Sequence, residues 1–473
     1  MKKGSSIIEL SETEEQYIKK YREWAEWLRN SMPTYFYKIT SSQEQAKILL
    51  YLQDIESSGY ARFSYHDALF TIRIYTQDSI VEDLETYKDK NIQSLEIHVS
   101  SRPAIINGKE QYIQIHKIIF YRREQKKNRL PLDLEKTKAV RKYIEARYKN
   151  FSMKLFEEIH GQFDRHFLSI SPPERIARYM NLYELASERD SVYLDIEQVQ
   201  KDSDHDRAST RLMLATINVP KTGFFLELAR VMRRFNYNLE RCYVSTLQHE
   251  KIDMVTIITF YLTDEDGNQL SGGRKLDIFL EELSMVKWLN ADDTLIWKLV
   301  ETGFFNTKQA YFLRAAADFI HQMLVDIDRH QFRHAVVDEA FIRHPDISEK
   351  LFRYFDARFN PVFYSEEDIE KARNELLQLI EGIDTGIPVN DKIRKKVLKT
   401  GMVFADNILK TNYYINKISA LSFRLNPEFI ASIIPDYKTL YPEIPFAVFY
   451  IKGRDFKGFH IRFRDLARGG LRT

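Results

Sequence analysis

The strongest constraint on the fold is an order of predicted strands and helices that occurs twice. In the clearer copy, "RLMLATINV" from Arg211 predicts a strand, "PKTG" a turn, "FFLELARVMRRFN" a helix, and "YNLERCYVS" and "MVTIITFYLT" two further strands. Phe225, Leu228, Met232 and Phe235 recur at helical spacing, so we expect them to pack against a sheet. Residues 211–262 therefore predict a strand–helix–strand–strand unit.

The earlier copy lies near the N-terminus. There "TYFYKI" predicts a strand, "SSQEQAKILLYLQDI" a helix, and "YARFSYH" and "ALFTIRIYT" two strands, and "IQSLEIHVS" and "QYIQIHKIIFYRRE" add two more. Strands with occasional helices in this order are typical of an α+β fold with antiparallel sheets. The recurrence predicts a degenerate internal repeat.

Long helical stretches separate these units from a final group of strands. Residues 132–186 have a helical pattern with a break at Ser171-Pro172-Pro173, and 290–412 are almost entirely helical. Strands resume after 417 with "ISALSFRL", "PFAVFYIKG" and "GFHIRFRD". We expect an N-terminal helix (1–31), an α+β module (32–130), a helical connector (131–190), a second α+β module (191–289), a helical region (290–416) and the start of a further domain (417–473).

Composition narrows the class of protein. Lys and Arg number 70 against 68 Asp and Glu, so no basic excess suggests a nucleic-acid partner. A single cysteine, Cys242, excludes an intrachain disulfide and fits a reducing compartment. The N-terminal residues contain no apolar signal core, and no apolar run reaches the length of a membrane span. We therefore expect a cytoplasmic protein that binds neither nucleic acid nor membrane.

Several local patterns suggest ligand sites but have simpler explanations. His330 and His334 are four positions apart, so on one helix they could bind the same metal ion. Because the sequence lacks the H-E-x-x-H pattern, a role on the polar surface or in inter-domain hydrogen bonding is favoured for them. The basic run 122–129 predicts a solvated linker, and "SGGRK" (271–275) a surface loop. The sequence contains no G-x-G-x-x-G dinucleotide fingerprint.

The last eleven residues, "FRDLARGGLRT", place a glycine pair between two arginines. Gly469 and Gly470 allow the backbone to approach a ligand closely, and Arg468 and Arg472 carry planar forks that suit a carboxylate or phosphate. The alternative is a tight turn after a strand. Because "GFHIRFRD" predicts a strand that leads directly into this segment, a ligand contact is favoured.

The segment "ALSFRLNP" … "YPEIPFAVFYIKGRDFKGFHIRFRDLARGGLR" (420–472) closely resembles the large NAD-dependent glutamate dehydrogenases at the start of their catalytic region. The resemblance implies oxidation of L-glutamate to 2-oxoglutarate and ammonia, with NAD as cofactor. Smaller relatives have K-G-G-[IL]-R at this place, where the lysine helps to hold a substrate carboxylate. By position, Arg468 replaces that lysine while Gly469, Gly470 and Arg472 match, so these four are the implied substrate-binding residues.

The same resemblance implies that most of the catalytic machinery lies outside this chain. The catalytic lysine and the nucleotide-binding domain of the family are expected downstream, so we assign no catalytic residue here. We also expect NAD to be bound by a domain absent from the chain. The chain alone is expected to be inactive, and the enzyme to be a homo-oligomer.

Regulatory modules that resemble ACT domains precede the catalytic region in this family. Such modules often bind an amino acid at the loop between their first strand and helix, which here is "VPKTGFF" and contains Pro220, Lys221 and Gly223. The aspartate common in that loop is absent, Asn218 being nearest, and no final strand is evident. Packing between subunits or onto the catalytic region is therefore favoured over ligand binding as the role of this module. A non-catalytic amino-acid-sensing or scaffold protein is the alternative function.

Overall fold

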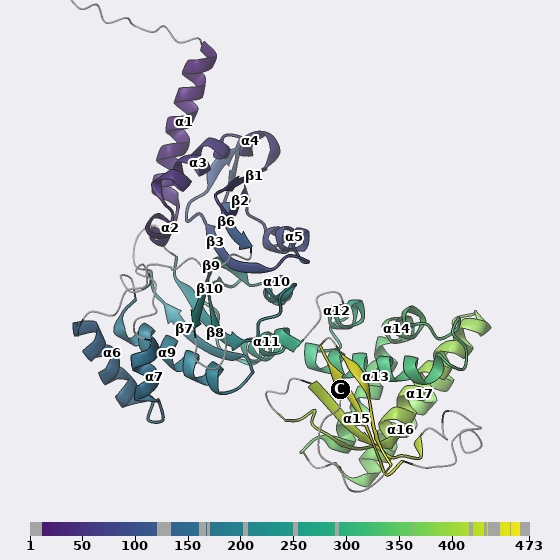
Figure 1. Ribbon diagram of the computed structural model, residues 1–473. Helices are drawn as coiled ribbons and strands as arrows, with labels where there is room; N and C mark the ends of the chain where they lie inside the picture. The colour runs from purple at the N-terminus through teal and green to yellow at the C-terminus, as the bar shows by residue number, and fades with distance from the viewer. Residues whose placement is uncertain are drawn as a thin grey trace, which may run out of the picture. The chain divides into compact units, whose positions relative to one another are not determined.

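The computed structural model divides into two compact units, Met1–Ser284 and Met285–Thr473 (Figure 1). It describes residues 12–120, 134–159, 167, 171–201, 207–248, 254–288, 293–362, 364–415, 420–429, 433, 445–454 and 456–463. Antiparallel sheets and helices occur in both units, so the predicted α+β class is confirmed.

An eight-stranded antiparallel sheet forms the centre of the first unit, in the order β1-β2-β6-β3-β9-β10-β8-β7. Its strands are β1 (Tyr60–Tyr65), β2 (Ala68–Ile74), β3 (Ile92–Val99), β6 (Ile113–Phe120), β7 (Tyr193–Val199), β8 (Ser209–Ile217), β9 (Asn238–Gln248) and β10 (Met254–Thr263). A hairpin of β4 (Ala104–Ile106) and β5 (Lys109–Gln111) lies between β3 and β6.

The two halves of this sheet repeat one topology. In the first half two strands, β1 and β2, precede helix α5 (Ser79–Thr86), and β3 and β6 follow it. In the second half β7 and β8 precede α10 (Phe224–Arg234), and β9 and β10 follow it. The halves join where β3 pairs with β9, through Ile97 opposite Cys242 and His98 opposite Arg241. An internal repeat is therefore present, but it differs from the predicted one, because its first copy consists of β1, β2, α5, β3 and β6 and does not begin with a strand at "TYFYKI". Residues 211–262 form the predicted strand–helix–strand–strand unit.

Helices cover both faces of the sheet. On one face lie α1 (Glu12–Ser31), α2 (Thr34–Ile39), α3 (Ser42–Leu52) and α4 (Ile55–Ser58) over the first half, and α6 (Leu134–Arg147), α7 (Met153–Ile159) and α9 (Pro173–Glu188) over the second. Helix α10 lies on the opposite face with α11 (Arg274–Met285), which a short 3-10 helix, η1 (Val286–Trp288), follows (Figure 1). Arg234 of α10 hydrogen-bonds Glu282 of α11, and the Phe235 and Phe279 rings lie 5.3 Å apart.

Three elements differ from the sequence prediction. The segment "TYFYKI" was predicted as a strand but forms α2, which starts after Pro33 and buries Phe36 fully. Helix α5 and strand β7 were not predicted. Strand β7 takes the position beside β8 where a final strand was expected, but it precedes β8 in the sequence instead of following α11.

The second unit packs six helices of the described chain against a four-stranded antiparallel sheet of order β11-β12-β13-β14. The helices are α12 (Thr294–Glu301), α13 (Thr307–Leu324), α14 (His334–Arg343), α15 (Pro345–Phe359), α16 (Glu366–Glu381) and α17 (Pro388–Asn407), and the strands are β11 (Ile408–Thr411), β12 (Ala420–Leu425), β13 (Ala447–Gly453) and β14 (Lys457–Arg462). Helix α13 lies at the centre of the core, where the rings of Phe319 and Tyr450 of the sheet meet edge to face with centroids 5.7 Å apart. Helices occupy most of the region 290–416 that was predicted to be helical, and strand β11 lies near its end.

Candidate functional site

The four substrate-binding residues implied by the resemblance, Arg468, Gly469, Gly470 and Arg472, lie outside the described residues. Strand β14, which precedes them, is described as far as Arg462, and it pairs with β13 from Lys452–Lys457 to Ala447–Arg462. The predicted strand "GFHIRFRD" is therefore present as far as Arg462, and it has a structural support in the second unit.

That support is a charged group around the buried side chain of Asp318, on α13. Arg314 Nη2 and Lys457 Nζ lie 2.8 and 2.7 Å from Asp318 Oδ1, and Lys452 Nζ lies 3.2 Å from Oδ2. Burial alone would raise the pKa of Asp318, but Arg314 and the two lysines outweigh it and lower the pKa. Because Lys452 and Lys457 face each other across the β13–β14 hairpin, Asp318 fastens the beginning of β14 to α13.

Further carboxylates balance the cations of this group. Arg314 Nη1 lies 2.8 and 2.9 Å from the two carboxylate oxygens of Asp338, and 3.9 Å from Asp293 Oδ1. We call Asp293, Arg314, Asp318, Asp338, Lys452 and Lys457 the Asp318 cluster. Its three carboxylates match its three cations, so it offers no surplus charge for a substrate and serves to position the hairpin.

The histidines singled out in the sequence do not form a metal site. His330 precedes α14, which begins at His334, so the two do not share a helix face as the spacing suggested. Instead the rings of His321 and His334 stack with centroids 3.5 Å apart, and His334 Nε2 lies 3.3 Å from Lys457 Nζ. Burial first, then Lys457 and His321, lower the pKa of His334 to about 4. No group of three or more metal-ligating side chains occurs within the described ranges.

The predicted effector loop lies where the two halves of the first unit meet. Gly223 precedes α10 with a positive φ of 74°, and its amide donates a 3.0 Å hydrogen bond to the Lys88 carbonyl. The cavity at this contact, lined by Pro220, Lys221 and Gly223 among others, measures about 10 Å³. That is about the room needed for one water molecule, so the loop is closed in this conformation.

The repeat places an equivalent contact across the junction. The loop after β2 touches the turn after α10, where the Tyr75 hydroxyl donates to Asn238 Oδ1 at 2.9 Å. In each half, the loop between the second strand and the helix therefore packs against the turn that follows the helix of the other half.

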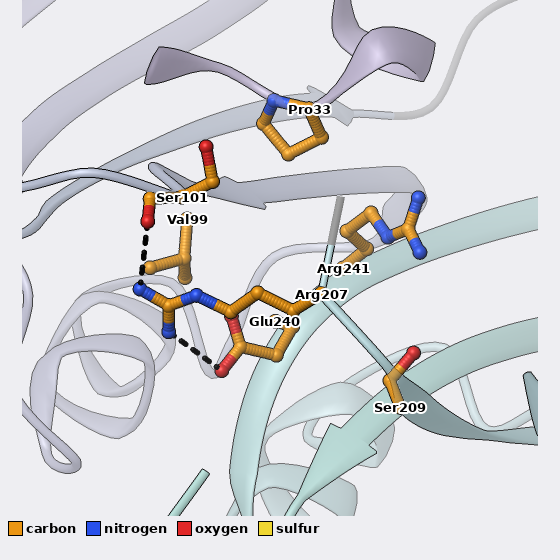
Figure 2. A pocket seen from close by; sticks show the side chains of 7 residues that line it. All are labelled: Pro33, Val99, Ser101, Arg207, Ser209, Glu240 and Arg241. Atoms are coloured by element: carbon orange, nitrogen blue, oxygen red, sulfur yellow. Dashed lines mark hydrogen bonds and ion pairs between the residues drawn. The ribbon is translucent and has the colours of Figure 1, made fainter. Parts of the chain in front are cut away.

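A second polar contact joins the halves near α2 (Figure 2). Arg207 reaches from the segment before β8, with Nη1 3.4 Å from Glu240 Oε1 and Nη2 3.3 Å from the carbonyl oxygens of Ser100 and Ser101. Its guanidinium also lies 4.4 Å from the Tyr112 ring centroid. The cavity here also measures about 10 Å³, which is room for about one water molecule. The Arg207 contact therefore connects the two halves of the sheet and does not line a ligand pocket in this cavity.

One other feature noted in the sequence has a structural role, and one lies outside the described residues. The loop "SGGRK" leads into α11, and Gly273 adopts a φ of 123° there. The basic run 122–129 lies outside the described residues. Within the described parts of the chain, no helix is long and apolar enough to cross a membrane.

The comparisons with known proteins point to one enzyme family. The family model for glutamate dehydrogenase, helical motif 3, matches residues 295–361, which include α13, α14 and α15 and nearly all of α12. The NAD-specific glutamate dehydrogenase of Saccharomyces cerevisiae is 25% identical over 366 residues, which cover 67% of this chain and 32% of that protein.

Shorter similarities agree. Glutamate dehydrogenase 2 of Dictyostelium discoideum is 30% identical over 155 residues, covering 32% of this chain and 14% of that protein. The NAD-specific glutamate dehydrogenase of Neurospora crassa is 37% identical over 84 residues, covering 18% of this chain and 7% of that protein. The chain spans about a third of the length of its yeast relative, and it is homologous to the large NAD-specific glutamate dehydrogenases.

Proposed function

We propose that this chain is the regulatory and assembly part of an NAD-dependent glutamate dehydrogenase, a cytoplasmic homo-oligomer that converts L-glutamate and NAD to 2-oxoglutarate, ammonia and NADH. The observation that carries this proposal is the similarity to the yeast enzyme over 366 residues, together with the helical motif 3 match. The chain contributes one edge of the substrate site, and NAD binds to another part of the enzyme.

In this proposal Arg468 holds a carboxylate of the substrate. A guanidinium can donate two parallel hydrogen bonds to a carboxylate, so it can replace the lysine of the smaller relatives. Gly469 and Gly470 leave room for the substrate beside the backbone, and Arg472 supplies further positive charge. The Asp318 cluster supports this role because it anchors the strand that leads toward Arg468.

The regulatory role rests on the topology of the first unit. Elements β8, α10, β9, β10 and α11 follow one another in the order strand–helix–strand–strand–helix. Strand β7 lies beside β8, where it takes the place of the last strand of a strand–helix–strand–strand–helix–strand module, although it comes first in the sequence. We therefore describe both halves as ACT-like and assign Pro220, Lys221 and Gly223 to an amino-acid effector. Because the cavity at that loop holds about one water molecule, effector binding requires the loop to move away from Lys88.

The test separates catalysis from regulation. The purified chain, mixed with glutamate and NAD, should produce no NADH above a blank without protein, whereas the enzyme that contains it should turn over. Steady turnover by the chain alone would show that it carries its own active site. A complete protein without glutamate dehydrogenase activity would instead support the scaffold alternative.

A further inference from the structure

A groove of about 620 Å³ lies in the second unit, between α15, α16 and the loop that precedes α13. On α15, Glu349, Phe352 and Asp356 line it at intervals of three and four positions, and on α16, Asp368 and Ala372 line it four positions apart. Such spacing places side chains on one face of a helix. The groove therefore runs along one face of each helix, and its volume is within the range of about 300–1,000 Å³ that is typical of small-molecule sites.

Aromatic rings form the apolar part of this groove. Phe305 and Phe352 are buried and belong to the core of the unit. Phe304 and Tyr364 also line the groove, but they are 53% and 36% exposed. The face of an aromatic ring carries negative partial charge, which attracts cations. The groove thus combines apolar contact with a preference for positive charge.

Most of the charged side chains in the groove are paired with one another. Lys350 Nζ lies 3.1 Å from Glu375 Oε2, and this pair joins α15 to α16. Arg353 pairs with Glu349, which is four positions earlier on α15. These two pairs use two of the three cations that line the groove.

The third cation, Lys371, lies near Asp368 at the start of α16. Asp368 Oδ2 accepts hydrogen bonds from the hydroxyl and the amide of Ser365, at 2.6 and 3.1 Å. Hydrogen bonds from Ser365 first, and the charge of Lys371 after them, lower the pKa of Asp368. Asp368 therefore has its own partners, in a cap of the helix.

Asp356 differs from the other three carboxylates of the groove. Its Oδ1 accepts hydrogen bonds from the Tyr414 hydroxyl and the Asn360 amide, at 2.5 and 3.0 Å, and its Oδ2 lies 3.4 Å from the Tyr364 hydroxyl. Burial first and then Asp356 raise the pKa of Tyr414, and Asp356 is the main cause that raises the pKa of Tyr364. Both hydroxyls therefore stay protonated and uncharged.

The charge of Asp356 is consequently not compensated by its neighbours. Among the described residues, no lysine, arginine or histidine nitrogen lies within 4.0 Å of its carboxylate oxygens. A carboxylate can accept about four hydrogen bonds, and Oδ2 has only the one long contact with Tyr364. Asp356 thus offers an open acceptor and a full negative charge to the groove.

From this arrangement we propose that the groove binds a small organic cation, a protonated primary amine on an apolar or aromatic body. The ammonium group donates a charge-assisted hydrogen bond to Asp356 Oδ2. The body of the ligand lies against the rings of Phe304 and Phe352. Because four carboxylates and three cations line the groove, one bound cation makes it neutral. The proposal concerns a further ligand and does not depend on the identity of the enzyme's substrate.

The test uses the full chain with three probes of similar shape. Benzylamine is a cation at neutral pH, benzyl alcohol is uncharged, and benzoate is an anion. We expect saturable binding of benzylamine by calorimetry, with a matching rise in the melting temperature. Benzyl alcohol and benzoate should bind at least about tenfold more weakly, because neither donates a charge-assisted hydrogen bond to a carboxylate.

Asp356→Asn removes the charge but keeps an oxygen that can accept the hydrogen bond from Tyr414. It should weaken benzylamine binding at least about tenfold and leave the binding of benzyl alcohol nearly unchanged. Asp346→Asn is the matched control. It makes the same change at an exposed position of α15 that does not line the groove, so benzylamine binding should stay the same.

Four results would overturn the proposal: no saturable binding of benzylamine, equal binding of benzyl alcohol, equal benzylamine binding by Asp356→Asn, or equal loss in Asp346→Asn. If Asp356→Asn does not fold, Phe304→Ala decides the question, because its ring is largely exposed and its removal should leave the fold intact. Benzylamine binding that is weaker by about threefold or more in Phe304→Ala supports the site, and unchanged binding rejects it.

Discussion

Lys457 Nζ lies 2.7 Å from Asp318 Oδ1, although 139 positions separate the two residues in the sequence. The contact joins the central helix of the second unit to the strand that leads toward Arg468. Since Arg314 and Lys452 reach the same carboxylate, Asp318 holds three cations together in a largely buried place.

Replacing Asp318 by asparagine should therefore destabilise the second unit strongly. Asp318→Asn leaves three neighbouring cations without their shared anion, and breaking a buried ion pair typically costs about 3–5 kcal/mol. Urea unfolding measures the loss. Glu339→Gln, which breaks an exposed pair with Arg343, is the control and should cost at most about 1 kcal/mol. Equal effects of the two substitutions would contradict the central role of Asp318.

The stability of the second unit should also depend on pH, because the Asp318 carboxylate titrates. Because the pKa of Asp318 is lowered in the folded state, its contribution to stability is present above the unfolded pKa of about 3.9 and is lost as pH falls through the folded pKa. Stability measured from pH 5 downward should thus fall more steeply for the parent than for Asp318→Asn. Parallel curves would show that Asp318 does not titrate as described.

The stacked histidines allow a direct test of the neighbouring charge. The pKa of His334 is lowered to about 4, by burial first and then by Lys457 and His321. Lys457→Met should move this pKa upward toward the ordinary value of about 6.5, as followed by NMR of the imidazole protons. Lys410→Met, an exposed change on β11, is the control and should leave the titration unchanged.

The direction of the stability effect follows from that lowered pKa. Between about pH 4 and 6.5 the unfolded chain binds a proton at His334 that the folded chain does not, so stability increases with pH across this window. His334→Gln should flatten that part of the curve. The contribution is modest because the side chain is half exposed.

Much of the fold could be predicted because its signals are local. The apolar face of α10 was evident from residue spacing, and Phe225, Leu228 and Met232 are buried as expected, whereas Phe235 lies at the helix end against Phe279. The segment that forms α2 has a strand-like run of aromatic residues. Its helix depends on burying Phe36 against distant residues, a tertiary preference that overrides local propensity.

The candidate sites were harder to predict because they depend on long-range contacts. Asp318 stands in the apolar stretch "AAADFIH", which could have marked it as a buried charge, but its partners lie more than a hundred positions away on β13 and β14. The contact of Tyr75 with Asn238 depends on the pairing register of strands from both halves of the sheet, which no short pattern contains. The substrate-binding assignments at 468–472 and the effector assignments at 220–223 stay predictions.

The packing of α10 can be tested by truncating one side chain. Met232 is 2% exposed in the core beneath α10, so Met232→Ala should lower the free energy of unfolding by about 2–5 kcal/mol. Denaturant unfolding of the chain measures this. Met254→Ala, at a more exposed position on β10, is the control and should change stability much less. An unchanged midpoint for Met232→Ala would place α10 away from the core.

The last prediction concerns Arg468 in the glutamate dehydrogenase that we propose. If Arg468 holds the substrate carboxylate, Arg468→Ala leaves that carboxylate underpaired in a desolvated site, a loss of about 2–5 kcal/mol. The kcat/KM for glutamate should then fall by a few orders of magnitude, measured with glutamate varied at saturating NAD. Arg468→Lys should retain part of the activity, because a lysine still supplies a cation at this position.

The alternative for Arg468 is that it only braces the turn after β14, and a melting curve separates the two roles. A bracing arginine predicts that Arg468→Ala lowers the melting temperature while kcat/KM stays within a few-fold of the parent. A substrate-holding arginine predicts the opposite, because a single polar contact at a site edge contributes little to global stability whereas the reacting complex loses a charge-assisted bond. NAD affinity should stay unchanged in Arg468→Ala, since the nucleotide is expected to bind another domain. Weaker NAD binding would therefore place Arg468 nearer the nucleotide than the substrate-holding role allows.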